Sequence, residues 1–191
     1  MRTLLLGVSS LILLGCSAAD IRQSAARSPV LEPERFFDGV LCADGVVRDY
    51  AGDQIRQFNA LIRASWTDAG VGTLDEVFYF VDEPGSPVVT ETRVWTIKRQ
   101  NDVYMASATD VPEAVPMNFS GNEIAMRYQL EYATGDDTIA LTMDDRMFLV
   151  TDNLLVNETR MIKWGIEVGQ VLLTIQKVAD ESMCHAVSLS G

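Results

Sequence analysis

Apolar and polar residues alternate with a period of two along most of the chain after Phe36. The clearest run covers residues 123–132, where apolar side chains occupy every even position and charged or amide side chains occupy most odd positions. Residues 57–67 follow the same rule, and residues 139–149 keep one apolar face that only Asp145 interrupts. Because successive residues of a strand point to opposite faces, this pattern predicts β-strands with one buried side.

Clusters of turn-forming residues separate these runs, at residues 83–87, 100–102, 134–137 and 151–153. They are rich in glycine, proline, asparagine and aspartate, which tight turns favour. The short connections make consecutive strands antiparallel. Together the runs and turns predict about nine strands, near residues 36–48, 55–67, 73–82, 88–99, 103–109, 123–133, 138–150, 154–164 and 170–178.

This strand pattern predicts an all-β fold, with residues 35–178 as one domain that contains no amphipathic helix. Many long strands paired in sequence order should curl and close, because closure removes the unpaired edges. We expect a closed antiparallel up-and-down β-barrel of lipocalin or calycin type with about 8–10 strands, which is wide enough for one small ligand. A β-sandwich is the alternative. Polar outer faces and the lack of aromatic girdles disfavour a barrel embedded in a membrane.

Residues 1–15 have the three parts of a bacterial export signal peptide. Arg2 supplies the positive start, an apolar stretch of about 11 residues follows, and Leu13-Leu14-Gly15-Cys16 resembles the lipobox of bacterial lipoproteins. In such proteins the chain is cut before the cysteine, whose thiol carries a diacylglycerol. Cys16 is therefore the predicted lipidation site, and residues 16–34 are the predicted lipidated tether. The alternatives are an ordinary secretory signal with a chance cysteine, or a buried helix.

The predicted lipid anchor also predicts a location. Several acyl chains, such as palmitate, on one residue should hold the protein firmly at a membrane. Ser17 follows the cysteine, whereas an aspartate at that position is typical of lipoproteins retained in the inner membrane. We therefore expect the periplasmic face of the outer membrane. The apolar stretch before Cys16 is too short to cross roughly 30 Å of hydrocarbon as a permanent helix.

Composition and charge exclude several classes of partner. The chain has 191 residues and is 48% hydrophobic, which is typical of a globular domain. Lys and Arg number 15 against 27 for Asp and Glu, and the net charge of −12 makes nucleic acid an unsuitable partner. The single histidine, His185, and the lack of a calcium-loop spacing favour neither a metal site nor a cofactor.

No catalytic residue is predicted. Ser182, Cys184 and His185 crowd the C-terminal tail, residues 179–191, which lies beyond the predicted domain. No nucleophile elbow or oxyanion-binding loop accompanies them. Acidic residues are abundant, but they have no defined spacing for acid–base hydrolysis. We expect a protein that is not an enzyme, with an enzyme acting on envelope lipid as a further hypothesis.

Polar residues on apolar faces mark the candidate ligand site, because a charge inside a barrel must be paired or hydrated. Glu76, Glu91, Arg93 and Asp145 each share a strand face with apolar neighbours. Methionine suits a variable apolar ligand. The candidate ligand-binding residues are Trp66, Phe78, Arg93, Trp95, Tyr128, Met143 and Asp145. Two alternatives remain: the charges form ion pairs at a barrel mouth or lie on a solvated outer face, and the aromatic residues are ordinary core.

Two cysteines remain once Cys16 is assigned to the lipid, namely Cys42 and Cys184. The periplasm permits disulfides, so we favour a bond between these two. That bond would attach the tail to the first strand. The alternative is a buried Cys42 that acts as a small hydrophobic residue beside a free Cys184.

Five short motifs, taken in order, resemble the DUF3833 lipoproteins of Gram-negative bacteria over residues 34–178. They are Phe36-Phe37-Asp38-Gly39, Gly72-Thr73-Leu74-Asp75-Glu76, Thr92-Arg93-Val94-Trp95, Asp144-Asp145 with Met147, and Lys163-Trp164-Gly165 leading to Val168-Gly169. The resemblance implies a calycin-like barrel without an established activity. It also implies an envelope lipid role, since the genes of the family often lie near cyclopropane-fatty-acid synthase. Arg146 and Glu158 depart from the family pattern, which usually has Trp and often Arg there.

These expectations combine into one functional hypothesis. The protein is a lipoprotein anchored to the outer membrane by its lipid, and its barrel cavity binds or carries a lipid or another small apolar molecule. The alternative is a structural or interaction module of the cell envelope with a filled barrel, whose protein partner the sequence does not identify.

Overall fold

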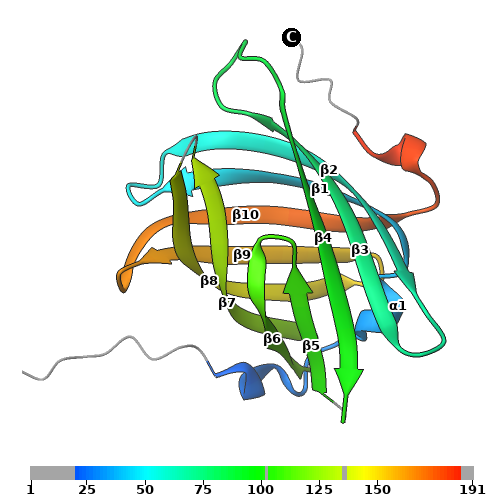
Figure 1. Cartoon of the computed structure of the whole chain (residues 1–191). Helices are drawn as coiled ribbons and strands as arrows, with labels where there is room; N and C mark the ends of the chain where they lie inside the picture. The colour runs from blue at the N-terminus through cyan, green and yellow to red at the C-terminus, as the bar shows by residue number, and fades with distance from the viewer. Residues whose placement is uncertain (1–19, 102, 135–136, 186–191) are drawn as a thin grey trace, which may run out of the picture.

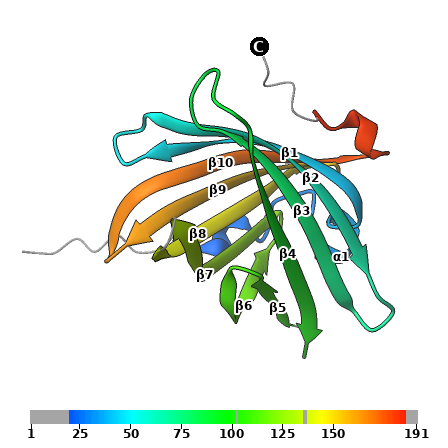
Figure 2. The same cartoon turned by 45° about the horizontal axis from the view of Figure 1, so that its top comes forward.

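The computed structural model describes residues 20–101, 103–134 and 137–185, which form a closed antiparallel barrel (Figure 1). Each strand pairs with the next along the chain, and the first pairs with the last. Figure 2 shows the sheet curving round on itself, so the predicted up-and-down barrel is confirmed. The strands are β1 (Gly39–Asp49), β2 (Gln54–Trp66), β3 (Val71–Val81), β4 (Val89–Gln100), β5 (Val103–Ala108), β6 (Val111–Ser120), β7 (Glu123–Thr134), β8 (Asp137–Thr151), β9 (Leu154–Lys163) and β10 (Ile166–Val178).

The strand that the sequence did not predict is β6. It contains Pro112 and Pro116, and proline has no backbone N–H to donate to a ladder. β6 pairs with β5 over much of its length, but its ladder with β7 joins only residues 118–120 to residues 123–125. The prolines explain both why the segment does not look like a strand in sequence and why its pairing is incomplete.

The alternation of the sequence decides which side chains enter the barrel. The even-numbered apolar residues from Phe58 to Ala64 in β2 and from Ile124 to Leu130 in β7 are buried, as the sequence predicts, whereas Trp66 is half-buried and Tyr132 is exposed. Gly45 on β1 is needed at one point of close approach, because an added Cβ would lie 2.5 Å from the Phe58 ring and 2.7 Å from Cβ of Leu173. Glycine there lets the Phe58 ring lie directly against β1.

One end of the barrel is closed by the segment before β1, which contains the short helix α1 (Pro33–Phe36). Leu31, Phe36 and Phe37 are each about 97–98% buried there. The indole Nε1 of Trp66, at the end of β2, donates to the Phe37 carbonyl oxygen over 2.7 Å. These contacts make an apolar plug at the end where β2 finishes.

The segment from Asp20 to Leu31 lies along the outside of the barrel and includes the 3₁₀ helix η1 (Ile21–Ser24). The Leu31 N–H donates to the carbonyl oxygen of Gly121, in the turn between β6 and β7. Ser24 donates to the carboxylate of Glu123 at the start of β7. The described part of the predicted tether is therefore held on the barrel wall. The predicted signal peptide and Cys16 lie outside the described residues.

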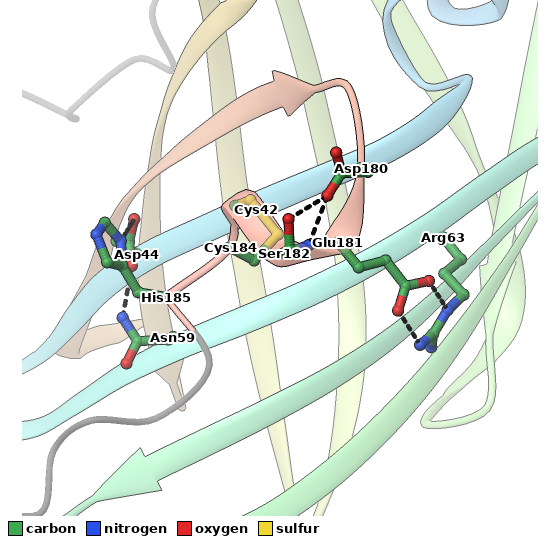
Figure 3. The surroundings of a disulfide bond; sticks show 9 residues. All are labelled: Cys42, Asp44, Asn59, Arg63, Asp180, Glu181, Ser182, Cys184 and His185. Atoms are coloured by element: carbon green, nitrogen blue, oxygen red, sulfur yellow. Dashed lines mark hydrogen bonds and ion pairs between the residues drawn. A yellow bond between two sulfur atoms is a disulfide. The ribbon is translucent and has the colours of Figure 1, made fainter.

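The described part of the C-terminal tail, residues 179–185, is fastened to the first two strands (Figure 3). Cys184 forms a disulfide with Cys42 of β1. Next to it, Glu181 of the 3₁₀ helix η2 (Glu181–Met183) accepts from Arg63 of β2 over 2.6 and 2.8 Å. Because the linked cysteines are 142 residues apart, the bond restricts the unfolded chain and raises the free energy of the unfolded state by about 5 kcal/mol. In the described part of the chain, no helix has the length and apolar character to cross a membrane.

Candidate functional site

The barrel encloses a cavity of about 170 Å³ to which all ten strands contribute side chains. Phe37 bounds it at the plugged end. A dry cavity of about 150 Å³ is large enough to bind benzene, so this space has the size of a small ligand or of one end of a longer molecule. It is smaller than the roughly 300 Å³ at which pockets for drug-sized ligands begin.

Aromatic and methionine side chains form most of the cavity wall. Phe58, Phe78 and Phe80 pack together with ring centroids 5.1 to 5.8 Å apart. On another part of the wall, Trp95 of β4 meets Tyr128 of β7 edge to face at 5.4 Å. Four methionines complete this apolar wall, namely Met117, Met126, Met143 and Met147.

Glu76 is the most unusual residue of the cavity. It lies on the lumen face of β3 between Leu74 and Phe78, and its residue surface is only 8% exposed. No hydrogen bond between described residues includes its carboxyl group, which borders the open space of the cavity and is not sealed in the wall. Burial raises the pKa of the Glu76 carboxyl to about 7, although the nearby Arg93 opposes the shift. Burial of a carboxyl without a donor is costly, which makes this residue a candidate functional group.

Arg93 lies opposite Glu76 in the β3–β4 register, but its guanidinium is directed to another carboxylate. Its Nε donates to Asp110 over 2.8 and 3.0 Å, and Nη2 lies 2.7 Å from the same carboxylate. Asp110 lies in the turn between β5 and β6, where its carbonyl oxygen accepts from the Glu131 N–H of β7 over 2.8 Å. The charge of Arg93 is therefore compensated mainly by Asp110.

A second lumen carboxylate belongs to Asp145 of β8, which is 5% exposed. Two neutral groups of β9 donate to it: the amide of Asn157, and the hydroxyl of Thr159 over 2.8 Å. Burial raises the pKa of Asp145, and these two donors oppose the shift. Burial likewise raises the pKa of Tyr128, which faces Arg93 and Asp145. Asp145 thus has donors of its own, which Glu76 lacks.

Arg56 marks the end of the barrel opposite the plug, near the start of β2. Its Nε donates to Asp82 over 2.6 Å, and its Nη2 donates to Glu91 over 3.0 Å. The guanidinium lies 3.8 Å from the ring centroid of Phe80. A longer contact of 3.4 Å joins Nη1 to the hydroxyl of Tyr132 on β7. Arg56 therefore links β2, β3, β4 and β7 at this mouth.

Six of the seven candidate ligand-binding residues line the cavity; they are Phe78, Arg93, Trp95, Tyr128, Met143 and Asp145. Trp66 does not, because its indole is bound to the plug and its ring packs against Tyr104 at 6.1 Å. Glu91 forms an ion pair with Arg56 at the mouth of the barrel. This is the alternative to a ligand-binding role that the sequence had left open. Arg146 and Glu158, where the family pattern is broken, lie on the outer face of the barrel.

Sequence reasoning left several site residues out of the candidate set. Glu76 carried a signal, because it interrupts the apolar face of Leu74 and Phe78. Asn157 and Thr159 lie between Leu155 and Met161 on the same strand face, and two small polar residues at such positions also fit an ordinary strand. In the described part of the chain, no three acidic, histidine or cysteine side chains are grouped so that they could hold a metal ion.

Comparison with known proteins identified a family and several similar structures, of which two are given below. A family model described as "Protein of unknown function (DUF3833)" matches residues 10–177. The S-type phycobiliprotein lyase CpeS from Guillardia theta is similar in structure, with a TM-score of 0.53, 10% identity and coverage of 85% of this chain and 99% of that one. A DUF3598-family protein of unknown function from Nostoc punctiforme gives a TM-score of 0.56 at 15% identity over 80% of this chain and 51% of that chain. The search of curated proteins found no match.

At these identities the two structures establish a shared fold only. The present chain spans about half the length of the DUF3598 protein. That the chain is not an enzyme stays a prediction, because one protein with this fold is named a lyase and a fold does not determine an activity.

Proposed function

The chain belongs to the DUF3833 family, and we propose that its barrel binds one small, largely apolar molecule, such as part of a lipid. The observation that carries this proposal is the cavity of about 170 Å³, which has an apolar wall and the buried Glu76 carboxyl. A cavity with many apolar groups and a few polar ones is the usual form of a small-molecule site.

The size of the cavity favours a binding role over a filled barrel. A space of about 170 Å³ remains between the side chains that line the lumen. Native cores are normally packed without such a space. A bound molecule would fill this space and make the van der Waals contacts that the lining side chains lack there.

We propose further that Cys16 carries a lipid and holds the barrel at the periplasmic face of the outer membrane. The described chain begins at Asp20, four residues beyond Cys16. Four extended residues span at most about 14 Å. Since the segment after Asp20 is attached to the barrel wall, a lipid on Cys16 would keep the barrel close to the membrane, where apolar molecules are available.

A cavity-filling variant tests the binding proposal. The protein is the full chain carrying Cys16→Ser, purified without detergent, and benzene is the probe. We expect benzene to raise the unfolding temperature, because a ligand that binds only the folded state stabilises it. Ala106→Leu places a larger side chain at the cavity wall and should remove most of this shift. Ala43→Leu, at another cavity position, should have the same effect.

The matched control is Ala140→Leu, which makes the same change at an exposed position of β8. It should keep the benzene shift of the unchanged protein. Equal shifts in the Ala106→Leu and Ala140→Leu proteins, or no shift in any of them, would contradict binding in the cavity.

A further inference from the structure

We propose that the bound molecule carries a hydrogen-bond donor, an alcohol or an amine, that binds the Glu76 carboxyl, and that molecules with a carboxylate or phosphate head are excluded. This inference rests on the proposed function, since it requires a ligand in the barrel. It adds the chemical class of the head group and its place in the cavity.

The position of the Glu76 carboxyl indicates which group a ligand must supply. Glu76 lines the cavity, its residue surface is only 8% exposed, and its carboxyl oxygens border the cavity space without a hydrogen bond to a described residue. A buried carboxyl normally has partners. A ligand that brings an O–H or N–H group would supply the missing donor, whereas a purely apolar ligand would leave the carboxyl without one.

The charges around Glu76 indicate which head groups are excluded. Four groups on other elements face it: Arg93 from β4, Tyr128 from β7, Asp145 from β8 and Asp110 from the β5–β6 turn. Arg93 is the one cation among the described residues that line the cavity, and it is bound to Asp110. An anionic head would therefore approach Glu76 and Asp145 without an available cation. Carboxylate and phosphate groups are normally recognised by arginine or lysine, and here the arginine is already engaged.

The residues beside Glu76 indicate where the apolar part of the ligand lies. Phe78 follows Glu76 on the same face of β3, and Phe78 packs against Phe58 of β2 with ring centroids 5.8 Å apart. Leu173 of β10 also lines the cavity and lies close to the Phe58 region. A ligand whose head binds Glu76 would have its hydrocarbon against these rings. The wall beside the carboxyl thus matches an amphiphilic molecule with one donor at its end.

Binding measurements with four small probes test this inference on the full chain carrying Cys16→Ser. The probes are hexan-1-ol, hexylamine, hexanoate and benzene, and affinities are measured by calorimetry at about pH 8 and about pH 5.5. At the higher pH, where Glu76 is ionised, we expect hexylamine and hexan-1-ol to bind at least about tenfold more tightly than hexanoate, because the lumen repels the carboxylate. At the higher pH hexylamine should also bind more tightly than hexan-1-ol, because its ammonium group pairs with the ionised carboxylate, and this advantage should disappear at the lower pH as Glu76 binds a proton.

Glu76→Gln should remove the advantage of the amine at about pH 8 and leave hexan-1-ol within about threefold, because the amide still accepts a hydrogen bond. Glu131→Gln is the control, because it makes the same change at an exposed position of β7. It should reproduce the unchanged protein. The probe ranking and its pH dependence in the unchanged protein test the inference even if a variant does not fold.

The outcomes separate this inference from the proposed function. Hexanoate binding as tightly as hexan-1-ol at about pH 8 would overturn the inference, as would the same probe ranking in the Glu76→Gln protein. In either case benzene binding would still support a ligand in the barrel. Failure of all four probes, benzene included, would overturn the proposed function itself.

Discussion

Two buried glutamates, Glu76 and Glu123, lie on opposite sides of the same barrel wall and have opposite surroundings. Glu123 is 1% exposed on the outer side, where Arg146 and Ser24 both donate to its carboxylate. Glu76 is 8% exposed in the lumen, and its carboxyl borders the cavity space without a hydrogen bond to a described residue. The comparison teaches that burial of a charge alone does not indicate a binding site. A buried carboxyl that faces a cavity without donors from the protein is the stronger indication of a binding site.

Glu123 connects the N-terminal segment to the barrel wall. Its partner Ser24 belongs to the segment that precedes the barrel, 99 residues away in the chain. Nearby, Leu31 donates to Gly121, and the Asn122 side chain donates to the Leu149 carbonyl oxygen over 3.0 Å. Glu123 thus holds the N-terminal segment against the β6–β7 turn. Glu76 makes no such contact between described segments.

The largest expected effect is therefore at Glu123. Glu123→Ala should lower the free energy of unfolding by about 3–5 kcal/mol, because it leaves the Arg146 guanidinium without its carboxylate in a largely buried place. Denaturant unfolding at neutral pH measures the change. A loss below about 1 kcal/mol would show that the pair contributes little and would weaken the comparison.

Glu76→Gln should raise the free energy of unfolding above neutral pH, whereas Glu123→Ala lowers it. The native pKa is raised to about 7 from 4.5, so the folded protein keeps a proton that the unfolded chain loses, and its stability falls as pH rises through this window. The amide does not ionise, so at about pH 8 the variant should be more stable by up to about 3 kcal/mol, from the 2.5 pKa units between 4.5 and 7.

The difference between the Glu76→Gln and unchanged proteins should shrink to nearly zero by about pH 4.5. Unfolding curves at several pH values test this, with Glu131→Gln as the exposed control that should stay within about 0.5 kcal/mol. A Glu76→Gln protein that is less stable at about pH 8 than the unchanged protein would mean that Glu76 has compensating partners when ionised.

A smaller effect is expected at Gly121, where φ is +56° and an added Cβ would lie 1.9 Å from the Ser24 carbonyl oxygen. Gly121→Ala should lower stability by about 1–3 kcal/mol and displace the N-terminal segment. Trypsin cleavage after Arg22 or Arg27, followed by mass spectrometry, should become faster in the variant. Unchanged cleavage would mean that other contacts hold the segment.

The smallest effect is expected from Ser24→Ala, which removes one donor to Glu123 and leaves Arg146 in place. The expected loss of stability is about 1 kcal/mol, typical of one hydrogen bond to a charged group with a remaining partner. Denaturant unfolding beside the Glu123→Ala protein measures it. A loss as large as that of Glu123→Ala would place most of the stabilisation in the serine contact.

Local alternation predicted most of the barrel, because each strand shows its period without reference to its neighbours. β6 was missed, since Pro112 and Pro116 conceal it. Six of the seven candidate ligand-binding residues reach the cavity, whereas Trp66 is bound by the plug before β1, whose position no periodicity encodes. The contrast between Glu76 and Glu123 was also beyond the sequence, because alternation does not say which face is inside. The chain that covers Glu123 comes from a distant segment.

The central claim is that a molecule with an apolar body and a donor head occupies the lumen beside Glu76. Native mass spectrometry of the Cys16→Ser chain, purified without detergent from a periplasmic fraction, tests it most directly, with organic extraction to identify any bound molecule. We predict one stoichiometric molecule with an alcohol or amine group, absent from the Ala106→Leu protein and retained by the Ala140→Leu protein. A bare mass in all three proteins, or a bound free fatty acid or phospholipid that Ala106→Leu removes, would contradict the claim.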